Sequence, residues 1–356
     1  MTRPATTCAL FQTMLAFLEA GRPFAVATVL VTDGSTPVKA GAKAIIEADG
    51  AIHGTIGGGQ VEANARRVGC GVVQSGNPLI FDFDLRGTQV QESQPICGGA
   101  MRVLVAPSSV IGHADCRAAA DALAQRGQGV WLTTLAKRGT LQVESRFVTQ
   151  ADLVKPGAFP GAEVCAECLA RETPHLAVWP GPEQREAFVE PLIPPPVLLI
   201  VGGGHVGQAV AAQASLLEFE IVVIDDRPEF TSPALFPPGV QTRCGSVAEE
   251  IAAFPVSRDT FVVIVTRGHQ HDAVALRACL RRPAAYIGMI GSRRKVPLLR
   301  REFIESGWAT AEEFDRAHAP IGLDIGAVTV PEIAASIMAQ VISARRQGAG
   351  PRIPLK

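Results

Sequence analysis

The chain has 356 residues, more than one ordinary hydrophobic core accommodates, so its length predicts two domains. With 47% hydrophobic and 19% charged residues, its composition is typical of a globular protein and argues against intrinsic disorder. A net charge of −1 indicates neither nucleic-acid binding nor attachment to an acidic membrane surface.

Eight cysteines are too few, in a chain of this length, for a dense disulfide framework. The apolar stretch near the N-terminus is interrupted by Gln12, Thr13 and Glu19, and its apolar residues recur at helical spacing. We therefore interpret it as a packed amphipathic helix rather than a secretion signal. No apolar run reaches membrane-spanning length. These features predict a cytoplasmic protein with reduced thiols and no membrane segment.

The first part of the chain alternates between strand-like and helix-like patterns. Runs of β-branched and apolar residues predict strands, and apolar residues at intervals of three and four predict helices. The expected strands are Phe24–Thr32, Ala44–Ile46, Leu79–Phe83, Met101–Val105, Val130–Leu135 and Leu141–Val148. The expected helices are the N-terminal one, Val61–Val73 and Ala114–Arg126. We expect residues 1–150 to form an α/β domain with a mixed sheet.

The composition of the sequence changes between residues 151 and 196. Prolines recur there and end in the run Pro194-Pro195-Pro196, which predicts a linker between domains. Cys165-Ala-Glu-Cys168 lies inside this stretch. A single CxxC lacks the second ligand pair of a structural zinc site, so we interpret these residues as two free thiols.

Residues 198–207 contain the motif Gly202-x-Gly204-x-x-Gly207 between an apolar strand and an Ala-rich helix. In a dinucleotide-binding fold such glycines form a tight turn, admit a phosphate and let the helix pack on the strand. The next strand ends at Asp225, near the usual position of a ribose-binding carboxylate. This context predicts a dinucleotide-type fold, while a bound dinucleotide is a separate claim.

Beyond this turn, strand and helix patterns alternate, which predicts a Rossmann-like, doubly wound parallel sheet over residues 197–346 and a tail at 347–356. Ligands bind such sheets at the carboxyl ends of their strands. Three loops there carry polar chemistry: Gly202–Gly207 with His205, Thr266–Asp272 with His269 and His271, and Gly291–Lys295. The histidines are more commonly hydrogen-bonding loop residues than ligands or catalysts.

Ser292 is a candidate helix N-cap, and Arg293, Arg294 and Lys295 crowd the first turn of the helix that follows. Cations at a helix N-terminus oppose the helix dipole, and an anionic ligand would relieve that repulsion. We therefore interpret the cluster as a phosphate site, with a solvated basic face as the alternative.

A second glycine turn, Gly57-Gly58-Gly59, opens a helix in the first domain. It either lets the backbone approach a ligand or is a plain tight turn. Glu62, in the first turn of that helix, is a candidate cap. As a carboxylate it also suits a ligand edge with several N–H donors, such as the aminopyrimidinone edge of a pterin. Cys97 precedes Gly98-Gly99, where close approach is possible and a thiolate suits soft sulfur or a soft metal, although a buried structural cysteine is the commoner case.

Several of these motifs resemble the XdhC/CoxI family of xanthine dehydrogenase accessory proteins. In the first half they are Gly34-Ser-Thr-Pro37, Gly54-Thr-Ile-Gly-Gly-Gly59 with Glu62, and Cys97-Gly-Gly99. In the second half they are Val201–Gly207, Thr266-Arg-Gly-His269 with Asp272, Ile287–Lys295 and His318–Gly326. The similarity runs over nearly the whole chain in the same order.

The resemblance implies a cytoplasmic, homodimeric maturation factor. Such a protein binds molybdenum cofactor (molybdopterin), supports its sulfuration by a cysteine desulfurase and supports its insertion into a xanthine dehydrogenase-type molybdenum hydroxylase. Many family members have two adjacent cysteines before the glycine pair, whereas here Ile96 takes one place. The cofactor has a phosphate, a donor-rich pterin edge and a soft sulfur and metal end. These match the cationic helix terminus, Glu62 and Cys97, respectively.

Two other classes compete with this role: an NAD(P)-dependent oxidoreductase that uses Gly202–Gly207 and Asp225, and a scaffold that only bridges hydroxylase and desulfurase. The sequence lacks a convincing substrate-pocket pattern beside the Rossmann turn. We therefore predict that Asp225 binds no nicotinamide ribose, that the chain more closely fits an accessory factor than an enzyme, and that Cys97 is the functional thiol among the eight cysteines.

Overall fold

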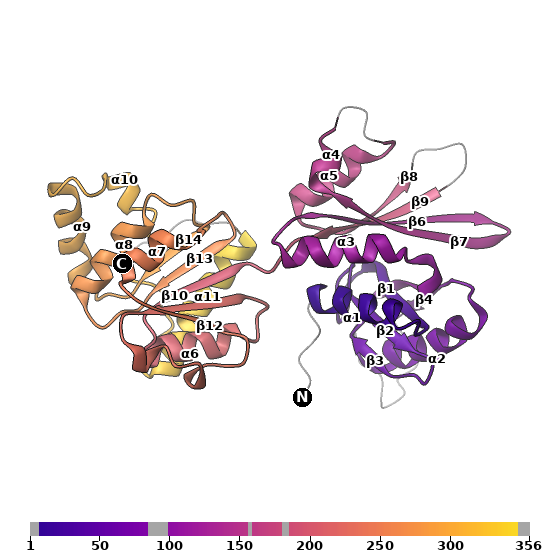
Figure 1. The fold of residues 1–356 in the computed structure, drawn as a ribbon, viewed down its shortest axis with the longest axis horizontal. Helices are drawn as coiled ribbons and strands as arrows, with labels where there is room; N and C mark the ends of the chain where they lie inside the picture. The colour runs from indigo at the N-terminus through magenta and orange to yellow at the C-terminus, as the bar shows by residue number, and fades with distance from the viewer. Residues whose placement is uncertain (1–6, 85–98, 156–158, 180–184, 348–356) are drawn as a thin grey trace. The chain divides into compact units, whose positions relative to one another are not determined.

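The computed structural model describes residues 7–84, 99–155, 159–179 and 185–347. The chain divides into two compact units, Met1–Pro194 and Pro195–Lys356 (Figure 1). Each unit has its own sheets and buried clusters. The two-domain expectation drawn from chain length therefore agrees with this division.

The first unit contains a five-stranded sheet in the order β3-β2-β1-β5-β4. Its four strand pairings are all antiparallel, so the sheet that the sequence predicted as mixed is antiparallel between its described neighbours. The strands are β1 (Phe24–Asp33), β2 (Lys43–Glu47), β3 (Ile52–Gly54), β4 (Leu79–Asp84) and β5 (Ala100–Pro107). The helices beside it are α1 (Thr7–Glu19), α2 (Gly59–Ser75) and α3 (His113–Ala124).

Both faces of this sheet are covered, which explains why β1 is apolar at successive positions rather than alternating. Ala25, Ala27 and Val29 face α2 in one buried cluster. Phe24 and Val26 belong to the cluster that contains α1 and α3. Because neighbouring residues of a strand point to opposite faces, a strand buried on both sides reads as a continuous apolar run.

A second antiparallel sheet, β7-β6-β9-β8, completes the first unit. A shared apolar cluster joins it to the first sheet through Leu30, Leu104 and Phe188. A buried ion pair also joins them, because Lys43 Nζ lies 2.6 Å from both carboxylate oxygens of Glu190. The strands are β6 (Gly129–Arg138), β7 (Thr140–Thr149), β8 (His175–Trp179) and β9 (Arg185–Leu192), and the helices are α4 (Gln150–Leu153) and α5 (Ala162–Arg171).

The expectation of a linker over residues 151–196 is wrong, because α5, β8 and β9 of the first unit lie in this stretch. β9 tolerates Pro191 because β8 pairs only with Arg185–Val189, so beyond that stretch the described register gives β9 one strand neighbour. The change of unit falls within the proline run itself, between Pro194 and Pro195.

The second unit contains a five-stranded parallel sheet in the order β12-β11-β10-β13-β14. In chain order this is 3-2-1-4-5, the arrangement of a Rossmann-like sheet. The strands are β10 (Val197–Val201), β11 (Glu220–Asp225), β12 (Gln241–Cys244), β13 (Thr260–Ile264) and β14 (Tyr286–Met289). The α-helices are α6 (His205–Ala214), α7 (Val247–Ala253), α8 (His269–Cys279), α9 (Lys295–Glu305), α10 (Ala311–Phe314) and α11 (Val330–Gln347).

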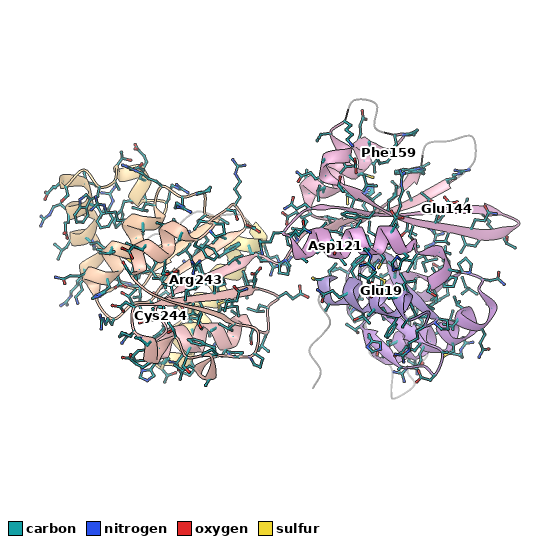
Figure 2. All side chains as sticks on the ribbon, viewed as in Figure 1. Glu19, Asp121, Glu144, Phe159, Arg243 and Cys244 are labelled. Carbon is teal, nitrogen blue, oxygen red and sulfur yellow. The ribbon has the colours of Figure 1, made fainter. Side chains whose placement is uncertain are left out.

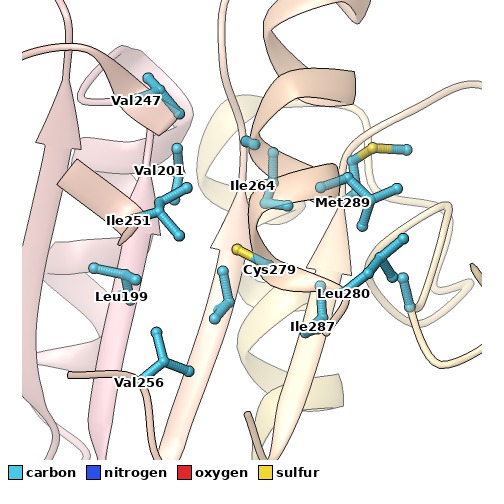
Figure 3. Close-up of a cluster of buried hydrophobic side chains, with 14 of the residues drawn as sticks. Leu199, Val201, Val247, Ile251, Val256, Ile264, Cys279, Leu280, Ile287 and Met289 are labelled. Atoms are coloured by element: carbon cyan, nitrogen blue, oxygen red, sulfur yellow. The ribbon is translucent and has the colours of Figure 1, made fainter. Parts of the chain in front are cut away.

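Helices cover both faces of the parallel sheet. On one face, α6 and α11 pack against Leu198 and Ile200 of β10. On the other, Ile251 of α7 and Cys279 of α8 pack against alternate strand residues such as Leu199, as Figure 3 shows. The predicted fold class, an α/β first domain and a doubly wound parallel sheet in the second, is confirmed.

Candidate functional site

The carboxyl ends of the parallel strands gather the polar loops of the second unit at one edge. β10 ends at Val201, directly before Gly202, β11 ends at Asp225, and β13 leads to Thr266. Strand order reverses between β10 and β13, and ligands of open α/β sheets bind at such a switch point. The structure thus brings together the loops that the sequence predicted to carry the site in this unit.

The glycine turn after β10 is packed tightly at three of its four glycines. A Cβ atom on Gly202 would lie 2.4 Å from the carbonyl oxygen of Val265, and one on Gly203 would lie 2.2 Å from that of Phe230. A Cβ atom on Gly207 would lie 1.9 Å from the Gly202 oxygen, so glycine lets α6 lie against the turn. A Cβ atom on Gly204 would meet nothing within 4 Å, so only this glycine leaves open space.

Asp225 accepts four hydrogen bonds, and its side chain is buried. The backbone N–H of Gly203 donates to Oδ2 at 2.8 Å, and the backbone N–H of Arg227 donates to Oδ1 at 3.0 Å. The Arg227 guanidinium donates to both oxygens, at 2.9 and 3.0 Å. Burial opposes the charge, but these bonds outweigh it and lower the pKa of Asp225. A carboxylate has about four lone-pair sites, so none is left for a ribose hydroxyl.

A small cavity beside this carboxylate has a volume of about 10 Å³, which is room for about one water molecule. Its lining includes Asp226, Arg267 and His271. Arg267 Nη2 lies 2.8 Å from Asp226 Oδ2 and 3.4 Å from His271 Nε2. Asp226, Arg267 and His271 therefore form a polar group beside the switch point.

The loop after β13 is held by its own side chains. Thr266 donates to Asp272 Oδ1 through its hydroxyl at 2.6 Å and through its backbone N–H at 3.1 Å. This pair ties the end of β13 to the first turn of α8, which begins at His269. His205 is the first residue of α6 and is exposed. His205 and His269 are therefore each the first residue of a helix that follows a strand of the parallel sheet.

The cationic segment after β14 is exposed to solvent. Arg293 and Arg294 precede α9, and Lys295 is its first residue. The Ser292 hydroxyl accepts a bond from the Lys295 backbone N–H at 3.3 Å, a weak form of the predicted cap. Arg293 pairs with Asp324, whose side chain is 70% exposed. Asp324 therefore competes with any anion for Arg293, a contact that no sequence pattern predicted.

Cys244 is a thiol at the same edge that sequence reasoning did not select. It ends β12 opposite Asp225 in the parallel register and is exposed, as the side-chain view in Figure 2 marks. The neighbouring Gly245 N–H donates to the Asp225 carbonyl oxygen at 3.2 Å. The position of Cys244 at a strand end was visible in the sequence, but its alignment with Asp225 depends on the register.

In the first unit, Gly57, Gly58 and Gly59 have φ angles of 113°, 69° and 56°. Three successive residues in this region require glycine, because L side chains rarely adopt it. A Cβ atom would meet nothing within 4 Å at Gly58 or Gly59, but would lie 2.6 Å from Pro37 Cγ at Gly57. The turn thus has one packed residue and two that leave the backbone accessible.

The Glu62 side chain makes no hydrogen bond to the described backbone at the start of α2. Its Oε2 accepts a bond from the Thr55 hydroxyl at 2.9 Å, and Thr55 Oγ1 in turn accepts the Gly57 N–H at 3.1 Å. The capping role considered for Glu62 is therefore replaced by a brace on the strand-to-helix turn. Its other carboxylate oxygen accepts no hydrogen bond from a described residue, and the side chain is half-buried.

Gly99 lies at the base of β5, where a Cβ atom would be 2.5 Å from the carbonyl oxygens of Asp33 and Ser35. Gly99 therefore packs against Ser35, and Gly57 packs on Pro37. Described residues of three motifs that are far apart in sequence thus meet where β1 ends and β5 begins. Cys97 and Gly98 lie outside the described residues.

The CxxC pair is structural. Cys165 and Cys168 lie on α5 and pack into the apolar cluster on the second sheet. Burial raises the pKa of Cys165 to about 11 and that of Cys168 to about 12, so both thiols stay protonated at neutral pH. This agrees with the interpretation as free thiols. Within the described ranges, no group of three or more His, Cys, Asp or Glu side chains could hold a metal ion.

Among the helices of the described ranges, none combines the length and the apolar character needed to cross a bilayer.

Comparisons with known proteins match both halves of the chain in order. The model of the XdhC and CoxI family matches residues 17–84, and that of the XdhC Rossmann domain matches residues 198–341. Uncharacterized protein YqeB of Escherichia coli is 28% identical over 333 residues, covering 93% of this chain and 45% of that protein. The chain therefore spans about half the length of that relative.

A probable xanthine dehydrogenase subunit of Bacillus subtilis is 26% identical over 338 residues, covering 95% of this chain and 98% of that protein. A crystal structure of a xanthine dehydrogenase from Bacillus halodurans shares the fold, with a TM-score of 0.75 and 24% identity over 96% of this chain and 98% of that one. With matches to both family models in sequence order, the chain belongs to the XdhC and CoxI family.

Proposed function

We propose that this protein is an accessory factor that carries molybdenum cofactor, supports its sulfuration by a cysteine desulfurase and supports its insertion into a xanthine dehydrogenase-type hydroxylase. The cofactor is cargo in this proposal rather than a resident group. The observation that carries the proposal is the match of both family models, in order, to a chain whose Rossmann turn donates its Gly203 N–H to its own Asp225. The Bacillus subtilis relative, named a probable xanthine dehydrogenase subunit, supports the link to that hydroxylase class.

The chemistry of the exposed groups supports cargo binding. Arg294 and Lys295 stand at the start of α9, exposed, where a helix N-terminus adds partial positive charge. Glu62 keeps one carboxylate oxygen that can accept an N–H or O–H donor of the cargo, beside the open backbone of Gly58 and Gly59. The two groups lie in different units, so each is proposed as a separate contact. Cys97 remains a prediction for the sulfur and metal end.

The oxidoreductase alternative is less well supported by the turn itself. A nicotinamide or flavin dinucleotide needs its ribose on the acid after the second strand and its pyrophosphate on the glycine N–H groups. Here Asp225 is fully bonded, and the Gly203 N–H is already donated to it. The residues present therefore do not fit a dinucleotide in its usual position, and we derive no hydride-transfer step.

Binding measurements with purified protein separate the three classes. NAD(H), NADP(H) and molybdenum cofactor are titrated separately, and binding of each is measured by calorimetry. Retention of the cofactor without binding of either nicotinamide nucleotide is the expected result. Steady NADH oxidation with a carbonyl substrate would overturn the proposal in favour of an oxidoreductase. Activation of the hydroxylase without binding of any of the three would favour a scaffold.

The thiol assignment has its own matched control within the chain. We expect Cys97→Ser to lower cofactor content and partner activity after co-expression with the hydroxylase. Cys165→Ser with Cys168→Ser should leave both unchanged, because those thiols are buried and protonated. Loss of activity only in the double variant would show that the buried pair, and not Cys97, is the functional thiol.

A further inference from the structure

A cavity of about 410 Å³ lies between the two sheets of the first unit, and none of its lining residues belongs to a glycine turn. One wall comes from β4 and β5 of the first sheet, through Ile80, Asp82 and Arg102. The facing wall comes from β6, β7 and β9 of the second sheet, through Leu135, Lys137, Leu141 and Glu186. The volume falls within the range of small-molecule sites, about 300–1,000 Å³.

A bidentate ion pair spans the cavity from sheet to sheet. Arg102 Nη1 and Nη2 each lie 3.0 Å from one carboxylate oxygen of Glu186. The side chains are 33% and 40% exposed, so the pair is open to a ligand rather than sealed in the core. Because both charges are already matched, the pair positions the two walls without favouring a cation or an anion.

Two further charged residues of the lining are uncommitted, one on each wall. Asp82 lies on β4 opposite Arg102 in the antiparallel register, and Lys137 lies on β6 opposite Leu141. Both are exposed, and neither makes a hydrogen bond or ion pair to another described residue. The first wall therefore offers a free acceptor and the second a free cation.

The remaining lining is aliphatic. Leu135 is buried, and Leu79 on the edge strand β4 is 44% exposed. A space between two packed sheets is slab-shaped, because sheets pack about 10 Å apart. Aliphatic walls on a slab suit a flat ring rather than a chain of polar groups.

We propose that this cavity binds a flat aminopyrimidinone, the ring edge common to guanine and pterins, that also carries an anionic group. The Asp82 carboxylate accepts the two adjacent N–H donors of that edge as a bidentate pair. The Lys137 ammonium binds the anionic group at the opposite wall. The aliphatic side chains hold the ring between them.

The choice between the two sources of this ring rests on the proposed function, which favours a pterin over a guanine nucleotide. The experiment therefore uses GMP and pterin-6-carboxylate as probes, with AMP and guanosine as controls that lack the aminopyrimidinone edge and the anion, respectively. Full-length protein is titrated by calorimetry. The variants are Asp82→Asn, Lys137→Met and, as a matched control, Glu144→Gln, an exposed carboxylate on β7 that does not line the cavity (Figure 2).

We expect wild-type protein to bind GMP, pterin-6-carboxylate or both. If GMP binds, its affinity should be at least tenfold higher than that of AMP. Asp82→Asn removes that preference. Lys137→Met weakens binding of the anionic probes about tenfold and leaves guanosine unchanged. Glu144→Gln behaves as wild type. Each variant keeps the wild-type melting temperature, since the substituted side chains have no described partner.

Equal affinity for AMP and GMP, insensitivity of binding to both cavity variants, or no binding of either probe at about 1 mM would each overturn the inference. Cofactor retention in cells separates this outcome from failure of the proposed function. If the cofactor is retained equally by wild type and both variants, the cavity assignment fails and the carrier role stands. If the probes bind as expected but no cofactor is retained, the carrier role fails and the cavity remains a ligand site.

Discussion

The turn before α2 places three successive glycines at positive φ, whereas in the turn before α6 only Gly202 does so. The turn before α6 needs glycine for a different reason, since added Cβ atoms would collide with carbonyl oxygens of its own fold. Two similar glycine patterns therefore have different physical causes. The α2 turn holds its backbone accessible at Gly58 and Gly59, and the α6 turn is packed shut except at Gly204.

The acidic residues beside the two turns also differ, in their burial and in their hydrogen bonding. Asp225 is buried and carries four hydrogen bonds, while Glu62 is half-buried and carries one from a described residue. A saturated carboxylate stabilises the fold, and a carboxylate with a free oxygen can bind a ligand. The carboxylate beside the α6 turn is thus bonded within the fold, whereas the one beside the α2 turn keeps an oxygen without a described donor.

The largest expected loss of stability comes from a substitution that disrupts the packed turn before α6. Gly207→Ala places a Cβ atom where only 1.9 Å separates it from the Gly202 oxygen, so α6 must shift away from its strand. We expect the free energy of unfolding of the second unit to fall by about 3 kcal/mol. This loss is measured by urea unfolding, with amide hydrogen exchange of β10 and α6 as the probe.

Gly204→Ala is the matched control for that variant. Its φ is −68° and an added Cβ atom meets nothing within 4 Å, so the change should stay within about 0.5 kcal/mol. Equal losses in the two variants would mean that packing does not distinguish these glycines.

The next effect concerns the saturated carboxylate. Asp225→Asn removes charge-assisted bonds from Arg227, and we expect a loss of about 2 kcal/mol at pH 7. Because folding lowers the pKa of Asp225, its charge stabilises the fold above the unfolded pKa of about 3.9, and that contribution is lost as pH falls through the folded value. The deficit of the variant should therefore shrink below about pH 4. A deficit that is constant with pH would show that the charge of Asp225 contributes nothing.

A smaller effect tests the open turn. Gly58→Ala introduces a side chain at a φ of 69°, which costs about 1–2 kcal/mol although no atom is in the way. Gly71, inside the helix that follows, has no positive φ and an added Cβ atom there meets nothing, so Gly71→Ala should stabilise by about 0.5–1 kcal/mol. Thermal melting of the two variants should therefore shift in opposite directions. A shift of the same sign would refute the backbone explanation.

The smallest effect concerns the exposed cations before α9. Arg293→Ala with Arg294→Ala should weaken binding of inorganic phosphate, and Asp324→Asn should strengthen it by freeing Arg293. Exposed ion pairs are worth about 0.2–1 kcal/mol, so we expect changes of about two- to fivefold in affinity. Unchanged phosphate affinity in both variants, measured by calorimetry at low salt, would assign these residues to a solvated basic face.

Much of the fold was predictable because apolar periodicity reports burial directly. The inner strands β10, β11 and β13 of the parallel sheet contain continuous apolar runs, as expected when helices cover both faces. The stretch 151–196 misled because prolines usually mark linkers. Pro191 lies within a strand instead, because in the described register β9 has a single strand neighbour at that position. Register is a long-range property, and no local pattern carries it.

The sequence predicted which loops meet at the candidate site, but not which side chains bond to one another there. The edge that collects Gly202, Asp225 and Thr266 follows from the parallel topology, which the alternating pattern indicated. The partners that fill Asp225, the Asp324 that neutralises Arg293 and the cavity between the two antiparallel sheets depend on side-chain geometry. Arg227, only two residues from Asp225, was the one local signal available.

The central claim is that the chain carries molybdenum cofactor to a hydroxylase, and transfer in a purified system tests it most directly. Protein is purified from cells that make the cofactor and from cells that do not, and each preparation is incubated with cofactor-free hydroxylase. The account predicts that hydroxylase turnover appears with the loaded preparation, that it rises with the pterin delivered, and that the unloaded preparation gives none. Equal turnover with both preparations, or none with a preparation shown to contain the pterin, would contradict it.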